Sequence, residues 1–156
     1  YRSKRFDLFK DVLQKTHRSF QVIAENKKVL FGLYNNCESP IIDADEYSVN
    51  QIFHHLVDNA FKYTSSGKVD ITIGRDPGNN IYVDVADTGI GIAEEFLPNL
   101  YSPFTREEKG YTRNYEGNGL GLALVKKYCE LNGATIKVIT AKEKGTTFRV
   151  SFPNPS

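Results

Sequence analysis

The chain has 156 residues, and its 20 Lys and Arg against 19 Asp and Glu give a formal net charge of +1. This length fits a single domain over residues 1–156, and the near-neutral charge gives no electrostatic basis for binding nucleic acid or a membrane surface. No apolar run approaches the roughly 20 residues that a membrane-spanning helix needs, and no basic and apolar signal segment opens the chain.

The first third of the chain predicts a helix followed by two short extended segments. Apolar residues recur at roughly helical spacing over Leu8–Ile23, and Asp7 can cap this helix. A short strand is expected at Val29–Leu33, and Pro40–Ile42 is expected to be extended.

The middle of the chain predicts the strongest helix and then a hairpin. Asp45 opens a helix with an unbroken i, i+3, i+4 apolar pattern, and a Ser-Ser-Gly sequence ends it before residue 68. Two strands, Lys68–Ile73 and Ile81–Asp87, are joined by a turn rich in Pro, Gly and Asn and therefore form a hairpin. A loop then runs to about Gly119, and an irregular stretch of this length in a compact domain is usually functional or mobile.

The last third predicts a helix over Leu120–Leu131 and a final hairpin made by Ala134–Thr140 and Thr146–Phe152. This element order predicts an α+β fold, a two-layer α/β sandwich with helices packed on one face of a mixed, mostly antiparallel sheet. The opposite face of the sheet should be more polar, because apolar and polar residues alternate over residues 81–86.

A polar stripe runs along the edge of the helix that Asp45 opens. It consists of Gln51, His55, Asn59 and Lys62, whereas His54 and Asp58 fall further round toward solvent. A carboxamide oxygen can ligate Mg²⁺, and an ammonium group can neutralise phosphate. Most polar stripes are only the solvated face of an amphipathic helix, so the stripe alone is weak evidence of a site.

The segment that follows the strand ending at Asp87 has the sequence Asp-Thr-Gly-Ile-Gly-Ile. Asp87 shares a strand face with Ile81, Val83 and Val85, so its carboxylate should point toward the core and need hydrogen-bond donors. An adenine amino group with a bridging water could supply them. Gly89 and Gly91 would let the backbone approach a flat ligand, although a plain turn explains the same residues.

Two further glycine-rich segments precede secondary structure. Residues 117–122, Gly-Asn-Gly-Leu-Gly-Leu, run into a helix whose N-terminus could bind phosphate, and a glycine-rich hinge is the alternative. No strand leads into these glycines, which argues against a dinucleotide-binding βαβ unit, and no Walker A motif is present in the sequence. Gly145 and Thr146 start the last strand and say little on their own.

The order of these segments is more specific than any one of them. The sequence patterns QxxxxLxxNAxKYT, DxGxG, SPF, GxGLGL and GTxF follow one another from about residue 6 to residue 153. In this order the chain resembles the catalytic ATP-binding domain of sensor histidine kinases, within the ATPase superfamily of gyrase, Hsp90 and MutL. The resemblance implies a Bergerat-type ATP-binding fold with a core of about residues 6–153 and a flexible lid over about residues 93–116.

The resemblance also implies a site for ATP and Mg²⁺. Asn59 would ligate the metal, Lys62 and Tyr63 would contact the phosphates and the ribose side, and Asp87 with Thr146 would hold adenine and its water. Phe104 would anchor the lid, and Arg106 is a candidate for the γ-phosphate, as are Lys62 and His55. The implied nucleotide-binding residues are His55, Asn59, Lys62, Tyr63, Asp87, Gly89, Gly91, Ile92, Phe104, Arg106, Gly117, Asn118, Gly119, Leu120, Gly121, Leu122 and Thr146.

His55 departs from the pattern of the family. Histidine kinases commonly carry a second asparagine one turn before Asn59, and gyrase and Hsp90 carry a glutamate that acts as a general base. His55 could contact phosphate or Mg²⁺, act as a base, or never touch the nucleotide. We expect contact with the ligand, because His55 lies on the stripe that contains Asn59.

The resemblance implies a protein-histidine kinase of a two-component system, and the acceptor histidine is expected in a separate dimerisation and phosphoacceptor domain. None of the three histidines lies in the expected acceptor context, so the isolated chain should bind Mg-ATP without autophosphorylating. A response regulator receiver domain would be reached through that other domain. The alternatives are a stand-alone ATPase, an anti-sigma-factor-type serine kinase and a non-enzymatic module of the same fold.

The origin of the chain is also predicted. The chain begins with Tyr1 and contains no Met, which indicates an excised fragment or a processed chain. Cys37 and Cys129 lie outside any metal-ligand spacing, so we expect two buried free thiols in a reducing compartment. We expect a cytoplasmic, monomeric fragment of a homodimeric parent that could be membrane-anchored, with no direct contact of the fragment to membrane or nucleic acid.

Overall fold

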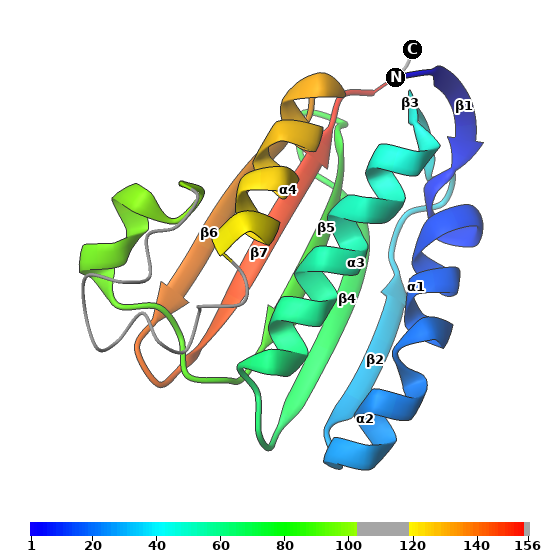
Figure 1. The fold of residues 1–156 in the computed structure, drawn as a ribbon. Helices are drawn as coiled ribbons and strands as arrows, with labels where there is room; N and C mark the ends of the chain where they lie inside the picture. Colours follow the sequence, from blue (N-terminus) through cyan, green and yellow to red (C-terminus); the bar gives the residue numbers. More distant parts are fainter. Residues whose placement is uncertain (103–118, 155–156) are drawn as a thin grey trace.

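A five-stranded sheet forms one layer of the molecule, and helices cover one of its faces (Figure 1). The computed structural model describes residues 1–102 and 119–154, with the backbone alone at 119 and 120. Across the sheet the strands are β2 (Leu30–Asn35), β4 (Lys68–Arg75), β5 (Ile81–Asp87), β7 (Gly145–Phe152) and β6 (Thr135–Ala141). Strands β2 and β4 are parallel, and the other three pairs are antiparallel. The predicted α+β sandwich is therefore confirmed.

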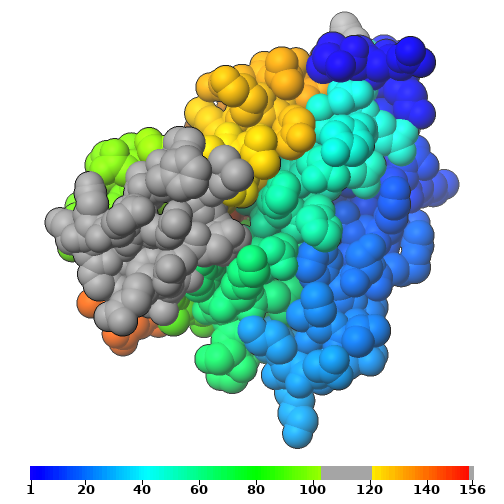
Figure 2. Space-filling view, viewed as in Figure 1, coloured from blue at the N-terminus to red at the C-terminus, as the bar shows by residue number. Residues whose placement is uncertain are grey.

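The helical layer contains α1 (Gln14–Ser19), α2 (Gln21–Lys27), α3 (Glu46–Lys62) and α4 (Gly119–Leu131). Helix α3 crosses the middle of the sheet between α4 and the N-terminal helices, and the space-filling view shows these three parts as adjacent bands (Figure 2). A π-helical turn η1 (Phe9–Leu13) precedes α1, and a 3-10 turn η2 (Glu94–Asn99) follows β5. Among the described helices, none combines the length and apolarity that a membrane crossing requires.

The chain begins with a strand that the sequence pattern does not predict. Strand β1 (Ser3–Asp7) pairs antiparallel with β3 (Ile41–Asp45) in a separate two-stranded sheet. Only Phe6 of β1 is buried, so the segment lacks the alternation of apolar residues that indicates a strand. The exposed pair of Arg5 and Asp43, with 2.9 Å between nitrogen and oxygen, adds to the pairing.

Side-chain caps place the helix starts near the predicted positions. Asp7 Oδ1 accepts a hydrogen bond from the Lys10 backbone N–H at 2.8 Å, and Asp45 accepts one from the Ser48 backbone N–H at 3.2 Å. Each cap satisfies a backbone donor that has no partner within its helix, which is typically worth about 1 kcal/mol. The Asp45 cap fixes where α3 begins and therefore which residues face the sheet.

The two faces of the sheet differ as the alternation predicts. Ile71, Val83 and Val150 on the inner face are fully buried under the helices. On the outer face, the Arg149 guanidinium donates two hydrogen bonds of 2.8 Å to the Asp84 carboxylate. The guanidinium also stacks on the ring of Tyr82, 3.8 Å from its centroid. The helices thus leave the outer face exposed, and polar side chains cover its centre.

The two cysteines lie in the core as free thiols. Cys37 and Cys129 are both buried, and neither forms a disulfide, which confirms the expectation of two buried free thiols. Burial raises the pKa of the Cys129 thiol to about 12. The thiolate of Cys129 is therefore a minor species at neutral pH, and this side chain acts as a small apolar core residue.

Candidate nucleotide site

The loop after β5 is fixed between the C-terminal end of α3 and the β6–β7 hairpin. The Ile90 backbone N–H donates to the Tyr63 carbonyl at 3.2 Å, and the Glu143 backbone N–H donates to the Ile90 carbonyl. The Ile92 backbone N–H donates to Thr140 Oγ1 at 2.9 Å. These contacts hold three segments that are distant in sequence around one region of the fold.

Asp87 ends β5 on the inner face of the sheet, as predicted. Its Oδ1 accepts a hydrogen bond of 2.9 Å from the Gly89 backbone N–H, and the Thr146 backbone N–H also donates to its carboxylate. Burial nevertheless raises the pKa of Asp87 to about 6, because desolvation outweighs the two donors. Because the two backbone donors do not offset the desolvation, a further hydrogen-bond donor would stabilise the ionised carboxylate.

Thr146 lies beside Asp87 because the two residues are partners in the β5–β7 register. The Thr146 hydroxyl is 2.8 Å from Thr140 Oγ1, and Thr140 Oγ1 donates to the Gly145 carbonyl at 3.1 Å. A hydroxyl has one proton, so when Thr140 gives its proton to the carbonyl, Thr146 must be the donor between the two hydroxyls. The remaining lone pairs of Thr146 are then available as acceptors.

Asn59 is buried on α3, and its carboxamide oxygen makes no hydrogen bond within the described part of the chain. A buried polar atom without a partner typically costs about 1–3 kcal/mol, so such an atom in a native fold indicates a role. A carboxamide oxygen is a hard donor that suits Mg²⁺. The described residues contain no group of three or more acidic, His or Cys side chains for a metal, so an ion here would need ligands from a phosphate-bearing partner.

His55 and Lys62 lie on the same stripe as Asn59, one turn before it and three residues after it. His55 is half-buried, and this burial, together with the neighbouring His54, lowers the pKa of its imidazole. The Lys62 ammonium forms an ion pair with the Asp58 carboxylate, with 3.2 Å between nitrogen and oxygen. Partly exposed i, i+4 pairs are worth only about 0.3–0.5 kcal/mol, so a phosphate could displace Asp58 easily.

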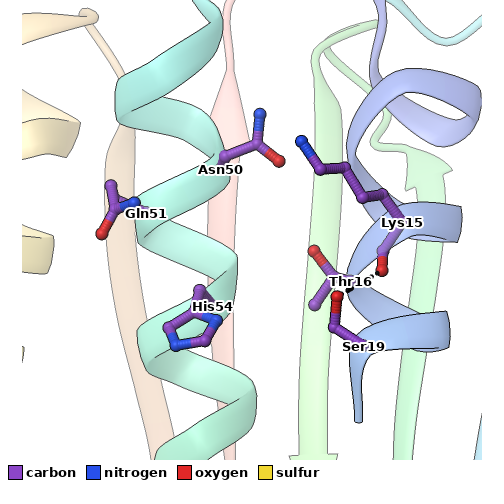
Figure 3. A pocket seen from close by; sticks show the side chains of 6 residues that line it. All are labelled: Lys15, Thr16, Ser19, Asn50, Gln51 and His54. Carbon is purple, nitrogen blue, oxygen red and sulfur yellow. Dashed lines mark hydrogen bonds between the residues drawn. The ribbon is translucent and has the colours of Figure 1, made fainter. Parts of the chain in front are cut away.

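The two adjacent histidines point to different places. His54 is exposed and lines a cavity of about 250 Å³ between α1 and α3 with Lys15, Thr16, Ser19, Asn50 and Gln51 (Figure 3). Its ring also lies 5.2 Å from the ring of Phe20. Gln51, predicted on the stripe of Asn59, also contributes to the lining, although its side chain lies on the side of α3 away from α1 (Figure 3); His55 does not line the cavity. The prediction that His54 faces solvent is confirmed.

Gly89 and Gly91 are required by close backbone packing. A Cβ atom at Gly89 would lie 2.1 Å from the Tyr63 carbonyl oxygen, and one at Gly91 would lie 1.9 Å from the Ala141 carbonyl oxygen. Gly91 also has a φ of +73°, which side-chain-bearing residues rarely adopt. The glycines therefore shape the wall beside Asp87 through contacts within the protein, a reason that the sequence did not reveal.

Two apolar residues of the predicted site, Ile92 and Leu122, are buried in the core. Leu122 belongs to α4, as do Gly119, Leu120 and Gly121, and α4 packs beside α3. Only the backbone is described at positions 119 and 120. Phe104, Arg106, Gly117 and Asn118 lie outside the described residues, so their predicted contacts stay predictions.

Thr64 and Thr140 are further polar residues of this region that the sequence does not single out. Thr64 Oγ1 is buried without a hydrogen-bond partner among the described residues, as is Asn59 Oδ1. Thr64 ends the sequence motif of α3, and a Cβ atom at Gly89 would lie 2.9 Å from its Oγ1. Thr140 links Ile92 to the β6–β7 hairpin. Only the place of Thr64 in the motif could have identified either of them.

Comparison with known proteins finds a family of ATPases and, among individual proteins, sensor histidine kinases. Residues 44–156 match the family model described as histidine kinase-, DNA gyrase B-, and HSP90-like ATPase. The chain is 36% identical over 152 residues to the autoinducer 2 sensor kinase/phosphatase LuxQ of Vibrio parahaemolyticus, covering 93% of this chain and 18% of LuxQ. It is 41% identical over 113 residues to an uncharacterised sensor-like histidine kinase of Rhizobium meliloti, covering 72% of this chain and 22% of that protein. The chain thus spans about a fifth of the length of these relatives.

Solved structures agree with the sequence matches. The structure superposes on full-length ShkA in complex with AMPPNP with a TM-score of 0.84 and 26% identity, covering 97% of this chain and 31% of ShkA. The nucleotide-free catalytic domain of the histidine kinase ThkA gives a TM-score of 0.82 at 22% identity, covering 98% of this chain and 96% of that domain. The second likeness shows the fold alone.

Proposed function

Because the chain belongs to the family of histidine kinase-, DNA gyrase B- and HSP90-like ATPases, we propose that it is the ATP-binding catalytic domain of a two-component sensor histidine kinase. In this proposal the domain binds Mg-ATP and delivers the γ-phosphoryl group to a histidine on a separate dimerisation and phosphoacceptor domain. The names of the relatives, which are sensor kinases much longer than this chain, support the presence of such further domains in the parent.

The adenine end of the proposed site is built on Asp87. Its carboxylate accepts the adenine amino group, and the Thr146 hydroxyl accepts from a water that bridges to the ring. Thr140 positions the Thr146 hydroxyl through the 2.8 Å contact, and the same Thr140 oxygen accepts from the Ile92 backbone N–H and so holds the loop against the β6–β7 hairpin. Asp87 is thus a specificity residue for adenine, because a base without an amino group would leave the buried carboxylate with only its two backbone donors, which do not offset its desolvation.

The phosphate end is built on the stripe of α3. Asn59 offers its buried oxygen to the metal, and Lys62 exchanges its ion pair with Asp58 for a phosphate oxygen. Mg²⁺ supplies neutralisation of charge on the β- and γ-phosphates when it is bound. Phosphoryl transfer needs mainly such positioning and neutralisation, so the domain needs no nucleophile of its own.

The observation that carries this proposal is the carboxamide oxygen of Asn59, buried and without a partner on the helix that ends beside the Asp87 loop. A structural asparagine in that position would be expected to find a donor or to be replaced by an apolar residue. A metal ion that binds together with a triphosphate would supply a partner for this oxygen.

Buried free thiols fit a reducing compartment, and we therefore propose that the domain lies in the cytoplasm.

Calorimetry with AMPPNP and Mg²⁺ tests nucleotide binding, and incubation with γ-labelled ATP and a supplied phosphoacceptor domain tests transfer. We expect binding by the chain alone, acid-labile label on the acceptor, and no stoichiometric label on the chain by itself. Asn59→Asp should weaken binding, with Asn50→Asp, on the cavity side of α3, as the matched control. Steady ATP hydrolysis without an acceptor would instead indicate a stand-alone ATPase, and transfer to a serine-bearing partner would indicate a serine kinase.

A further inference from the structure

His55 is positioned to take part in the metal site together with Asn59. The two residues are four apart on α3, so their side chains lie on one face of the helix one above the other. His55 is half-buried beside the fully buried part of that face. Neither of its ring nitrogens makes a hydrogen bond with another described residue, in contrast to His17, whose ring contacts the Phe31 carbonyl at 3.1 Å.

The surroundings of His55 do not give it a structural task. Its ring lies 5.8 Å from that of His54, in an edge-on arrangement that places two cationic centres near each other if both are protonated. Asp58, the nearest carboxylate on the same helix, is held by Lys62 at 3.2 Å. A neutral imidazole has one nitrogen lone pair, and no described residue hydrogen-bonds the ring of His55, so this lone pair is available to a metal ion.

An imidazole nitrogen and a carboxamide oxygen prefer different metals. Oxygen ligands suit Mg²⁺, which also keeps several of its waters. Imidazole suits first-row transition metals, and Mn²⁺ accepts both oxygen and nitrogen ligands. A site that offers one imidazole nitrogen, one carboxamide oxygen and phosphate oxygens should therefore favour Mn²⁺ over Mg²⁺. A site with an asparagine in place of the histidine should show less of this preference.

We propose that His55, together with Asn59, gives the nucleotide site a higher affinity for Mn-ATP than for the Mg-ATP of the proposed function. This inference rests on the proposed function, because the remaining ligands come from the triphosphate. Two protein ligands and no acidic cluster would hold the ion only when nucleotide is present, since the described residues contain no group of three or more His, Cys, Asp and Glu side chains that could hold a metal. Metal and nucleotide should consequently bind as a unit.

The test measures AMPPNP affinity by calorimetry with Mn²⁺ and with Mg²⁺ for the wild-type chain, His55→Asn and the matched control His54→Asn. We expect the wild type and His54→Asn to bind about tenfold more tightly with Mn²⁺, the equivalent of about 1.4 kcal/mol from one ligand. His55→Asn should reduce this ratio to near one by losing Mn²⁺ affinity while keeping its affinity with Mg²⁺. Circular dichroism establishes that each variant is folded.

Pulsed electron paramagnetic resonance of bound Mn²⁺ gives a readout that does not depend on affinity. Coupling to an imidazole ¹⁴N is expected in the wild type and in His54→Asn when AMPPNP is present, and it should vanish in His55→Asn. Equal metal ratios in wild type and His55→Asn, or no imidazole coupling in the wild type, would overturn this inference and leave the proposed function intact. Failure of AMPPNP to bind with either metal would overturn the proposed function as well.

Discussion

Asp87→Asn should make the nucleotide-free protein more stable at neutral pH while it weakens nucleotide binding. The substitution keeps the size of the side chain and removes its charge. Burial raises the pKa of Asp87 to about 6, so at pH 7.5 the folded protein holds an ionised carboxylate in an environment that disfavours it. Removing the charge removes that cost.

The size of the gain follows from the pKa. A change from 3.8 in the unfolded chain to about 6 in the folded protein corresponds to a cost of at most about 3 kcal/mol at neutral pH. The amide oxygen of asparagine is a weaker acceptor than a carboxylate oxygen, so the backbone hydrogen bonds from Gly89 and Thr146 weaken at a total cost of about 1 kcal/mol. We therefore expect Asp87→Asn to raise the free energy of unfolding by about 1–2 kcal/mol at pH 7.5.

The sign of the effect should change with pH. Because the folded pKa is raised, the folded state binds the proton more tightly, and this contribution to stability is fully present below pH 3.8. It is lost as the pH rises to about 6 and stays absent above that value. The stability difference between variant and wild type should hence grow across this window, and near pH 4 the variant should be slightly the less stable protein.

Urea unfolding of both proteins at several pH values between 4 and 7.5 measures this difference, and calorimetry with AMPPNP measures binding. Glu95→Gln, at an exposed carboxyl group on η2, is the control and should change the free energy of unfolding by less than about 0.5 kcal/mol at every pH. A variant that is less stable than wild type at pH 7.5, or a difference that does not depend on pH, would refute the assigned environment of Asp87. Unchanged AMPPNP affinity would refute its assigned contact with adenine.

Three further substitutions test the packing that shapes the site. Gly89→Ala would place a Cβ atom 2.1 Å from the Tyr63 carbonyl oxygen and should lower the free energy of unfolding by about 1–3 kcal/mol in urea, whereas Gly78→Ala, with 3.4 Å of clearance, should not. Thr140→Val removes a hydroxyl that bonds Ile92, Gly145 and Thr146, and it should cost about 1–3 kcal/mol and weaken AMPPNP binding in calorimetry. Arg149→Met breaks the two-bond pair on the outer face and should cost about 1 kcal/mol with AMPPNP binding unchanged. A loss of binding in the last variant would mean that the outer face is coupled to the site.

The sequence predicted best where local chemistry and periodicity agree. The cap at Asp45 and the apolar repeat together place α3 within a residue of its observed start, and this fixes Asn59 on a buried face. The alternation in β5 likewise places Asp87 on the inner face. In both places the local sequence pattern alone determines which face of the element is buried, so no knowledge of distant contacts is needed.

The sequence was insufficient where a partner distant in sequence decides the outcome. Strand β1 has no apolar alternation, and it forms because β3 offers an edge and Asp43 pairs with Arg5. Gly89 and Gly91 are needed because the Tyr63 and Ala141 carbonyls approach them, which no pattern within the loop reveals.

Two energetically unfavourable groups, Asn59 and Asp87, belong to the proposed nucleotide site. The carboxamide oxygen of Asn59 is buried without a hydrogen-bond donor. The Asp87 carboxylate is ionised at neutral pH although its burial raises its pKa. The first group lacks a cation or donor and the second lacks a further donor, so the two deficits call for different partners. A nucleotide with its metal supplies both at once, an amino group at one end and an ion at the other. Repairing either group with an apolar or neutral side chain should stabilise the empty protein, and this conflict between stability and binding is what a ligand site imposes on a fold.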